Sequence, residues 1–329
     1  MPSNPQGQPH NSFRSVTMPK KMIHTLEELK DLQALPLDFK VAMTRDRITE
    51  FYERMDGKVY VAFSGGKDST VLLHIARSIY PDIKAVYANI GIDFPSVVKF
   101  VNSFDNVDYV QPKMRFATII KKHGIVFPSK DASRVLKDAR RGCRYALMAL
   151  EGRNVNGEED AYKKRFMPLK KYLDVDVPIS DVCCELLKEK PMRDYEKATG
   201  LRPITAIMAV ESSRRTLAWL TKGCNILDGG NERSKPMSFW TEQDVLQYVV
   251  ENHIPIADVY GDVCSMGLLE KKYWTTGEKR TGCMFCAVPL AHGENRLPSV
   301  KKRCPKMYDT FINKLGLGEM FRKLGLNYE

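Results

Sequence analysis

The chain alternates short apolar runs with longer amphipathic segments over most of its length. Runs rich in β-branched and aromatic residues predict strands, and segments with apolar residues three and four apart predict helices that cover them. An amphipathic stretch over Thr25–Arg54 predicts a helical lead-in. Because the predicted strands alternate with helices, the pattern indicates an α/β fold with a doubly wound parallel sheet. The strands are predicted at Val59–Phe63, Ile83–Ile90, Val107–Val110, Ile204–Val210 and Asn225–Leu227.

Changes in composition divide the chain into three parts. Residues 1–24 are rich in Pro, Ser, Asn and Gln and lack the apolar core of a signal peptide, so we expect a flexible N-terminal tail. Residues 25–250 contain the strand and helix pattern and are expected to form the α/β domain. Residues 251–329 are rich in Gly, Pro, Lys and Cys and are expected to form an irregular C-terminal subdomain that carries cysteines. A polar surface loop is expected over Gly152–Tyr162.

The first predicted strand runs directly into the segment Ser64–Ser69, with the sequence Ser-Gly-Gly-Lys-Asp-Ser, and a helix follows. Two glycines let the backbone approach an anion closely, and successive N–H groups at a helix N-terminus form a nest of donors. Lys67 adds a mobile positive charge, and two serine hydroxyls add further donors. A Gly-Gly turn before a capped helix has a similar composition, but the place between strand and helix favours a phosphate site. The spacing differs from that of the Walker loop.

The overall composition is that of an ordinary soluble protein, with 43% hydrophobic and 28% charged residues among 329. No apolar run approaches the ~20 residues of a membrane span, and we expect a cytoplasmic location. The formal net charge of +11 suits a polyanionic partner such as tRNA or DNA, although a protein can be basic without one. The basic clusters are Lys121–Lys122, Lys137–Arg144, Lys163–Arg165, Lys170–Lys171 and Lys301–Arg303.

Four of the eight cysteines form two suggestive patterns, the vicinal pair Cys183-Cys184 and the Cys-x-x-Cys pair of Cys283 and Cys286. Adjacent cysteines can barely bridge each other, whereas both thiolates can reach one metal centre. Four thiolates suit an iron–sulfur cluster or a structural zinc ion, and a redox dithiol or unrelated buried thiols are alternatives. The other cysteines are expected to be core or surface thiols, with a nucleophile conceivable only where arginines surround Cys143. They are Cys143, Cys224, Cys264 and Cys304.

These motifs together resemble a known family. The loop Ser64–Ser69 matches the pyrophosphate loop of the PP-loop ATP pyrophosphatase (adenine nucleotide alpha hydrolase-like) superfamily. The cysteine pattern resembles the phosphoadenosine phosphosulfate (PAPS) and adenosine phosphosulfate (APS) reductase family within it, and the resemblance extends from about Phe51 to Met307. It implies an adenine nucleotide, either ATP or PAPS/APS, bound next to a [4Fe–4S] cluster. The implied cluster ligands are Cys183, Cys184, Cys283 and Cys286.

The resemblance also implies roles for individual residues. Catalytic roles fall on Lys67, Asp68 and Arg215. Lys67, the backbone amides and Mg²⁺ would stabilise charge on a departing pyrophosphate. The family's segment with a Pro, a Trp-Thr pair and an Asp-Val pair recurs at Lys235–Val245, where Thr241 and Asp244 predict a capped helix start. The implied nucleotide-binding residues are Ser64, Gly65, Gly66, Lys67, Asp68, Ser69, Gly91, Glu211 and Arg215.

The sequence departs from the family at several positions. Asn89 and Ile90 replace a family Asp-Thr, and Met208 stands where an Arg is common. Reductases of this family attack sulfur with a cysteine near the C-terminus, and Leu324 stands in that place. We therefore expect an enzyme that couples ATP-dependent adenylation to sulfur transfer, as in tRNA or DNA modification, with a sulfur donor protein. The alternatives are a PAPS/APS reductase that lacks the usual cysteine and uses thioredoxin, or a non-catalytic nucleotide-binding regulator.

Overall fold

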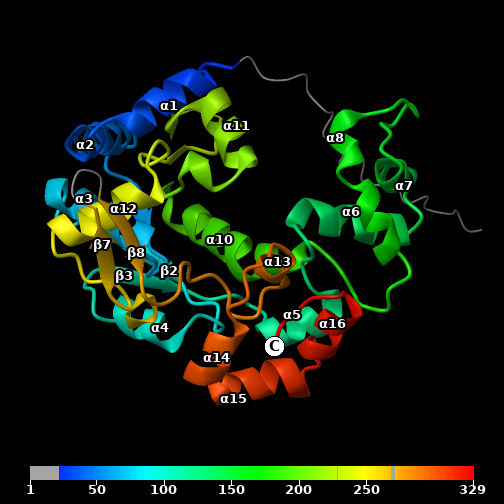
Figure 1. Cartoon of the computed structure of the whole chain (residues 1–329). Coiled ribbons are helices and arrows are strands. Elements are labelled where there is room, and N and C mark those ends of the chain that lie inside the picture. Colours follow the sequence, from blue (N-terminus) through cyan, green and yellow to red (C-terminus); the bar gives the residue numbers. More distant parts are fainter. Residues whose placement is uncertain (1–21, 228, 268–270) are drawn as a thin grey trace, which may run out of the picture.

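A computed structural model describes residues 22–227, 229–267 and 271–329, so most of the expected N-terminal tail lies outside the described residues. The centre is a six-stranded sheet with the order β3-β2-β1-β4-β6-β5 (Figure 1). The strands are β1 (Val59–Ala62), β2 (Ala85–Ala88), β3 (Val107–Val110), β4 (Arg202–Ile204), β5 (Asn225–Ile226) and β6 (Arg233–Ser234).

The sheet is parallel except at one edge. β1 pairs in parallel with β2 and with β4, β2 with β3, and β4 with β6, whereas β5 runs antiparallel to β6. The chain moves outward from β1 to β3 on one side and then returns to β4 on the other side of β1. This arrangement confirms the predicted doubly wound α/β sheet, and it puts the switch in strand order between β1 and β4, where ligands of such sheets bind.

One predicted strand differs from the structure. The apolar run Ile204–Val210 was expected as a strand, but β4 ends at Ile204 and a 3₁₀ turn, η3 (Ala209–Glu211), follows. The chain continues past the carboxyl end of β4, where the Thr205 amide donates to the Ser234 carbonyl at 2.9 Å. Met208 and Ala209 of the run are therefore buried in a loop, whereas Val210 is exposed, and an apolar run does not distinguish such a loop from a strand.

Helices cover both faces of the sheet. The alternation of β1 directs Tyr60 towards α10, where its ring meets Tyr195 edge-on at 5.6 Å, and directs Val59 and Val61 to the opposite face. The predicted lead-in is two helices, because Pro36 separates α1 from α2. The helices around the sheet are α1 (Leu26–Ala34), α2 (Leu37–Arg54), α3 (Lys67–Ile79), α4 (Pro95–Val101), α10 (Lys190–Thr199), α11 (Ser213–Lys222) and α12 (Glu242–Glu251).

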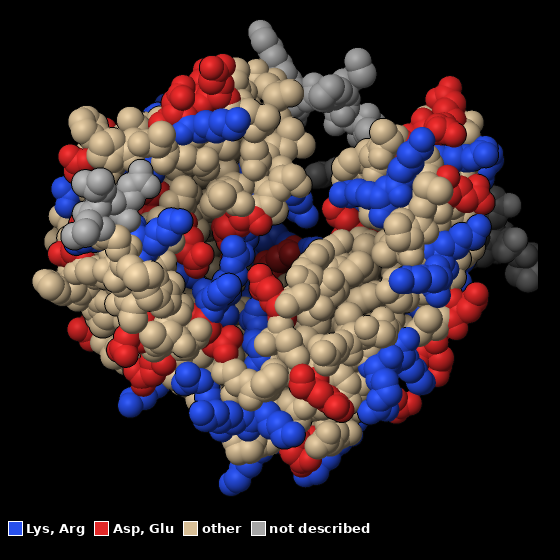
Figure 2. Space-filling view, in the orientation of Figure 1, with Lys and Arg blue, Asp and Glu red and all other residues tan. Residues whose placement is uncertain are grey.

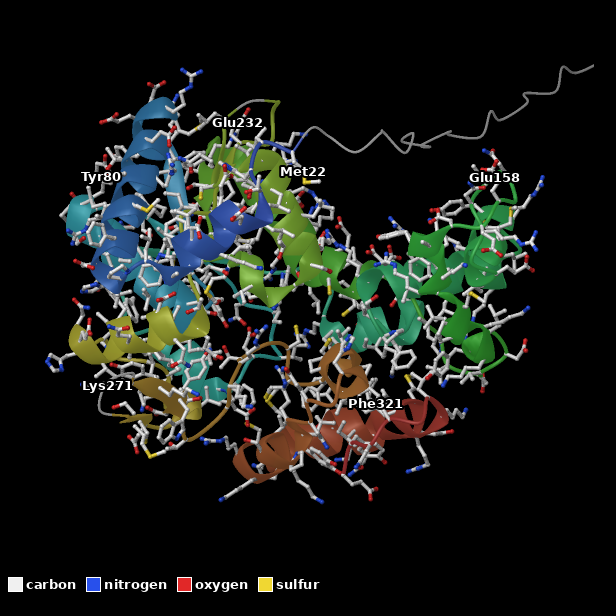
Figure 3. All side chains as sticks on the ribbon, turned by 45° about the horizontal axis from the view of Figure 1, so that its top comes forward. Met22, Tyr80, Glu158, Glu232, Lys271 and Phe321 are labelled. Atoms are coloured by element: carbon white, nitrogen blue, oxygen red, sulfur yellow. The ribbon has the colours of Figure 1, made fainter. Side chains whose placement is uncertain are left out.

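A helical lobe stands to one side of the sheet (Figure 1). Its outer end carries Glu158, which lies far from Tyr80 on the opposite side of the molecule in Figure 3. The expected polar loop is irregular up to Asp160, whose side chain caps the last short helix of the lobe. The lobe contains α6 (Lys130–Arg140), α7 (Arg144–Leu150) and α8 (Ala161–Lys164).

The C-terminal segment contains a hairpin and short helices joined by irregular loops. The hairpin packs on α12, where the Gln243 side chain bonds the Tyr273 backbone at 2.8 and 2.9 Å. The short helices pack on α5 (Phe116–His123), whose Phe116 meets Phe311 at 5.5 Å. None of the helices in the described part of the chain is long and apolar enough to cross a membrane. The elements are β7 (Val263–Met266), β8 (Lys272–Thr275), α13 (Ala287–Ala291), α14 (Leu297–Arg303), α15 (Pro305–Tyr308) and α16 (Leu317–Lys323).

Candidate functional site

The loop between β1 and α3 has the geometry of an anion cradle. Gly65 has a φ of +68°, and Gly66 is the residue that precedes the first turn of α3. The Ser69 hydroxyl accepts from the Ser64 amide at 3.1 Å and holds the loop closed. Among the described residues, the amides of Gly65, Asp68 and Ser69 have no acceptor. Free amides at the N-terminus of a 13-residue helix are donors for a bound anion.

Lys67 is held more tightly than the sequence suggested. Its side chain is 3% exposed, and its Nζ donates to the Lys279 carbonyl at 2.8 Å and pairs with Glu242 at 3.0 Å. Burial acts to lower the pKa of Lys67, but Asp68, Tyr260 and Glu242 outweigh it and the pKa is raised. Lys67 is therefore a fixed cation in this arrangement and not the mobile charge that we expected.

A network of charged side chains lies beside the loop. Burial raises the pKa of Asp68 above its usual value, against the opposing effects of Lys67, Arg280 and Arg215. Arg215 forms an ion pair with Glu211, and Arg280 lies 3.6 Å from the same carboxylate. The structure thus brings three sequence-predicted residues together, namely Asp68, Glu211 and Arg215, and adds Arg280, which the sequence did not single out.

Gly91 does not join this group. It follows β2 in a left-handed conformation with a φ of +74°, and a Cβ there would contact nothing within 4 Å. Gly91 lines none of the three cavities described below, although its neighbour Asp93 lines one of them. Gly91 thus lies in the turn after β2, but the structure does not place this glycine in the lining of the three cavities.

Two cavities open at the carboxyl end of β1, and Ala62 lines both. One, of about 180 Å³, lies over the ends of β1 and β2 and is bordered by Ser64, Lys188 and Thr281. The other, of about 850 Å³, lies on the β4 side and reaches towards the helical lobe. Figure 2 shows this hollow between the lobe and the sheet domain, with charged side chains of both signs along it. The smaller space borders the phosphate loop, and the larger space can hold a second substrate.

The four cysteines with suggestive spacing line a third cavity, of about 80 Å³, which is called the thiol cavity below. Cys183 and Cys184 come from α9 (Val182–Cys184), and Cys286 precedes the first turn of α13. The amide of Met284, inside the Cys-x-x-Cys segment, donates to the Ile92 carbonyl at 3.1 Å and ties the segment to the loop after β2. The remaining wall is apolar, with Phe116 and Leu187 among its residues.

The electrostatics of this cavity favour a positively charged metal centre to which thiolates can bind. Burial, followed by the neighbouring cysteines, raises the pKa of Cys183 above its usual value, and the same causes raise the pKa of Cys286 to about 12. Cys283 is the main cause that raises the pKa of Lys188 to about 12. Without a compensating positive charge the buried thiols stay protonated. A bound metal centre supplies that charge.

The chemistry of the four thiol donors suits an iron–sulfur cluster. Within the described ranges, no three His, Cys, Asp or Glu side chains converge closely enough to hold one metal ion. A [4Fe–4S] cluster needs no such convergence, because each of its four thiolate ligands binds a different iron atom. Four cysteines around one apolar cavity meet that requirement. They are the residues that could hold such a cluster, and single-ion zinc binding requires them to move closer together.

Lys188 is the most informative residue that the sequence did not single out as a site residue. It lines the thiol cavity and both cavities at the end of β1. It follows Cys183 by five residues in a helical segment that turns into a π-helix, η2 (Glu185–Glu189). Its position relative to the cysteine pair is a signal that could have revealed it.

The other residues near the phosphate loop that the sequence analysis did not identify have no local sequence pattern that marks them. Glu242, Tyr260, Arg280 and Thr281 all contact the phosphate loop or its charged neighbours, and all come from segments far along the chain. The remaining cysteines lie outside the thiol cavity. Leu324, at the position of the family's nucleophile, is 3% exposed and packs in the hydrophobic core behind α16.

Comparison with known proteins gives a family for part of the chain. Residues 58–126 match the family described as "Phosphoadenosine phosphosulfate reductase domain". This segment extends from the start of β1 through the phosphate loop to the residues after α5. For residues 58–126, the match agrees with the family that the loop motif resembles.

Two curated relatives are uncharacterized proteins of Methanocaldococcus jannaschii. One is 24% identical over 324 residues, which is 94% of this chain and 54% of that protein. The other is 32% identical over 92 residues, or 26% of this chain and 22% of that protein. The chain thus spans about half the length of the first relative and about a fifth of the second.

Among solved structures, the chain is similar to the crystal structure of a PAPS reductase from Candida auris in complex with phosphate. The two are 15% identical with a TM-score of 0.38, and the match covers 71% of this chain and 90% of that one.

Proposed function

We propose, from the premise that residues 58–126 belong to the phosphoadenosine phosphosulfate reductase domain family, that the protein couples ATP-dependent adenylation to sulfur transfer. The family implies an adenine nucleotide as ligand, and ATP is the one that we propose. The cavity of about 180 Å³ beside the phosphate loop is here called the nucleotide cavity. The observation that carries the proposal is that one residue, Lys188, borders both this cavity and the cavity lined by four cysteines.

In the proposed first step, an oxygen of the acceptor attacks the α-phosphorus of ATP. The bond from that phosphorus to the bridging oxygen breaks, pyrophosphate leaves with the electron pair, and the acceptor proton passes to solvent. The free amides of Gly65, Asp68 and Ser69 hold the departing pyrophosphate. Preorganised donors of this kind each contribute roughly 10²–10³-fold to the rate. A sulfide-level nucleophile from the sulfur donor then attacks the carbon that bears the adenylated oxygen, the carbon–oxygen bond breaks, and AMP leaves with the electron pair.

Mg²⁺ is the expected companion of the nucleotide. Asp68 suits it, because Oδ1 of Asp68 is buried and has no hydrogen-bond partner among the described residues. The carboxylate would hold the ion together with the phosphate oxygens, and the ion would act as a Lewis acid on them. Lys67 and Arg215 bring further positive charge to the same side of the loop.

The four cysteines of the thiol cavity would hold a [4Fe–4S] cluster, which supplies a soft, electron-rich site for sulfur chemistry when bound. The protein's own part is to hold and shield it. Lys188 places an ammonium group beside Cys283, and this cysteine is the main cause that raises the pKa of Lys188. Phe116 and Leu187 keep water from the cavity wall.

The larger cavity suits a polyanionic acceptor, for which we propose tRNA or DNA. Three of its cations, Arg214, Arg233 and Lys235, form no ion pair with a carboxylate of the described residues. Burial and the neighbouring cations lower the pKa of Lys235, as expected in a space that lacks its counter-ion. Phosphodiester groups would supply the missing negative charge.

A PAPS/APS reductase reaction has less support. It needs a mobile thiolate at the position of Leu324, and this leucine is buried in the core. None of the cysteines of the described chain lines the nucleotide cavity.

The test is a measurement of pyrophosphate release by anaerobically purified protein with Mg²⁺ and ATP, with and without bulk tRNA or DNA. We expect release that nucleic acid stimulates, and loss of at least ~10²-fold in Asp68→Asn. Brown protein with absorbance near ~400 nm, lost in Cys183→Ser and in Cys286→Ser but not in Cys224→Ser, is expected for the cluster. No ATP turnover, together with thioredoxin-dependent sulfite release from PAPS or APS, would refute the proposal. Nucleotide binding without either reaction would point to a regulator.

A further inference from the structure

The phenol of Tyr260 lies between the phosphate loop and the segment that carries Cys283 and Cys286. Tyr260 ends the 3₁₀ turn η4 (Asp258–Tyr260) and is buried. Its hydroxyl accepts from the Lys67 amide at 3.2 Å and shares a hydrogen bond of 2.9 Å with the Thr281 hydroxyl. Because Thr281 precedes Cys283 by two residues, one phenol connects the first residue of α3 to the cysteine segment.

A second connection runs parallel to the first. The Lys67 ammonium donates to the Lys279 carbonyl at 2.8 Å, and it lies 5.4 Å from the centre of the Tyr260 ring. The cysteine segment is fastened again further along, where the Met284 amide donates to the Ile92 carbonyl. The segment that supplies two of the four thiols is therefore attached to both loops that border the nucleotide cavity.

The hydroxyls of this connection also border the ligand space. A Cβ at Gly66 would lie 3.3 Å from the Tyr260 hydroxyl and 3.4 Å from the Thr281 hydroxyl, so both groups close on the loop at this glycine. Thr281 lines the nucleotide cavity together with Ser64. An anion held by the loop amides consequently gains a hydroxyl donor, that of Thr281, from the cysteine segment itself.

We propose that Tyr260 is a positioning residue that couples nucleotide binding at the phosphate loop to the order of the thiol centre. The inference rests on the proposed function, since it needs a nucleotide at the loop. A bound anion and the Lys67 amide favour the same position of Tyr260 and Thr281, and this position holds Cys283 and Cys286 at their cavity. Thermodynamic linkage makes the effect reciprocal, so an ordered thiol centre raises nucleotide affinity by the same factor.

The experiment measures the reactivity of the thiols in the full-length protein. After removal of metal by a chelator under reducing, anaerobic conditions, Cys283 and Cys286 are alkylated with iodoacetamide and quantified by mass spectrometry, with Cys143 as the internal reference. We expect Mg²⁺ and ATP to slow alkylation of the wild-type pair by at least ~5-fold, the lower end of typical coupling. We expect less than ~2-fold protection in Tyr260→Phe at saturating ATP. Tyr308→Phe, which removes a hydroxyl on α15, is the matched control and is expected to behave as wild type.

Further readouts decide between the explanations. In untreated protein, ATP is expected to slow iron loss to a chelator in the wild type and not in Tyr260→Phe. Equal protection by ATP in wild type and Tyr260→Phe would overturn the inference, because it would show simple shielding by the nucleotide. ATP binding by calorimetry without any protection would overturn it too, while leaving the proposed function intact. Absence of ATP binding would overturn both. If circular dichroism shows that Tyr260→Phe does not fold, Thr281→Val takes its place, because it removes the hydrogen bond between the Thr281 and Tyr260 hydroxyls.

Discussion

The phosphate loop depends on a close contact between Gly65 and helix α4, and Gly65→Ala tests this dependence. The residue has a φ of +68°, in the left-handed region, and turns the chain directly over α4. An alanine Cβ would lie 2.7 Å from Cγ2 of Val101 and 2.8 Å from Cγ1 of Val97. Real Cβ atoms do not approach carbon this closely, so either the loop or the helix must move.

The expected cost has two parts. A non-glycine residue in the left-handed region costs about 1–2 kcal/mol, and forcing a methyl group into a packed contact costs a further ~1–3 kcal/mol. We therefore expect Gly65→Ala to lower the free energy of unfolding by about 2–5 kcal/mol. Gly91→Ala isolates the first part, because Gly91 has a similar φ of +74° but nothing lies within 4 Å of its Cβ. It should cost only about 1–2 kcal/mol.

The assay is urea denaturation of both variants, followed by calorimetric titration with Mg²⁺ and ATP. We expect Gly65→Ala to lose ATP affinity, because displacement of the loop misplaces the free amides, and Gly91→Ala to retain it. In a Val101→Ala background the penalty of Gly65→Ala should shrink, since one of the two clashing methyl groups is absent. Equal losses of stability in the two glycine variants, or an unchanged penalty in the Val101→Ala background, would refute the argument from crowding.

Three further predictions follow from other contacts. Lys40, which is 2% exposed, donates to both carboxylate oxygens of Asp244 at 2.8 Å. Asp244→Ala leaves this buried ammonium unpaired and should lower the free energy of unfolding, measured by urea denaturation, by about 3–5 kcal/mol; a decrease below ~1 kcal/mol would contradict this. Because burial lowers the pKa of Lys235, its charge is lost at a lower pH than that of an ordinary lysine, and oligonucleotide affinity should fall as the pH rises towards the usual lysine pKa. Lys235→Arg should flatten this dependence, and equal profiles would exclude the role. Leu324→Cys should yield no sulfite release from PAPS, since the side chain is buried, and activity there would restore the reductase interpretation.

Much of the fold could be predicted because its signals are local. The strand runs at Val59, Ile83 and Val107 have the β-branched composition of buried parallel strands, and their positions agree with β1, β2 and β3 to within a few residues. Thr241 and Asp244 form the predicted capping box of α12. The two-residue strand β6 escaped prediction because Arg233 and Ser234 carry no apolar pattern and are ordered by their neighbours in the sheet.

The site was predictable only where one segment supplies both the geometry and the chemistry. The loop Ser64–Ser69 is such a segment, since its glycines, its helix start and its donors are contiguous. The cysteines were visible as two spacings, but that they share one cavity follows only from the packing of α9 against the start of α13. Tyr260 and Glu242 reach the loop from roughly 200 residues away, and no local pattern distinguishes a tyrosine that packs from one that also bridges two loops.

The position of Lys188 follows from the helix that precedes α10. Lys188 lies in the π-helical turn η2, whose hydrogen bonds join residues five apart, and Cys183 lies five residues before it in α9. Both residues line the thiol cavity, and Lys188 is the one charged side chain among the described residues around it. A regular α-helical turn would rotate the lysine away from one of the two adjacent cysteines. A neutral residue there would leave buried thiolates without a cation, because the other lining residues are cysteines and apolar side chains. The segment that begins at the cysteine pair and continues through η2 thus presents one side chain to both the thiol cavity and the nucleotide cavity.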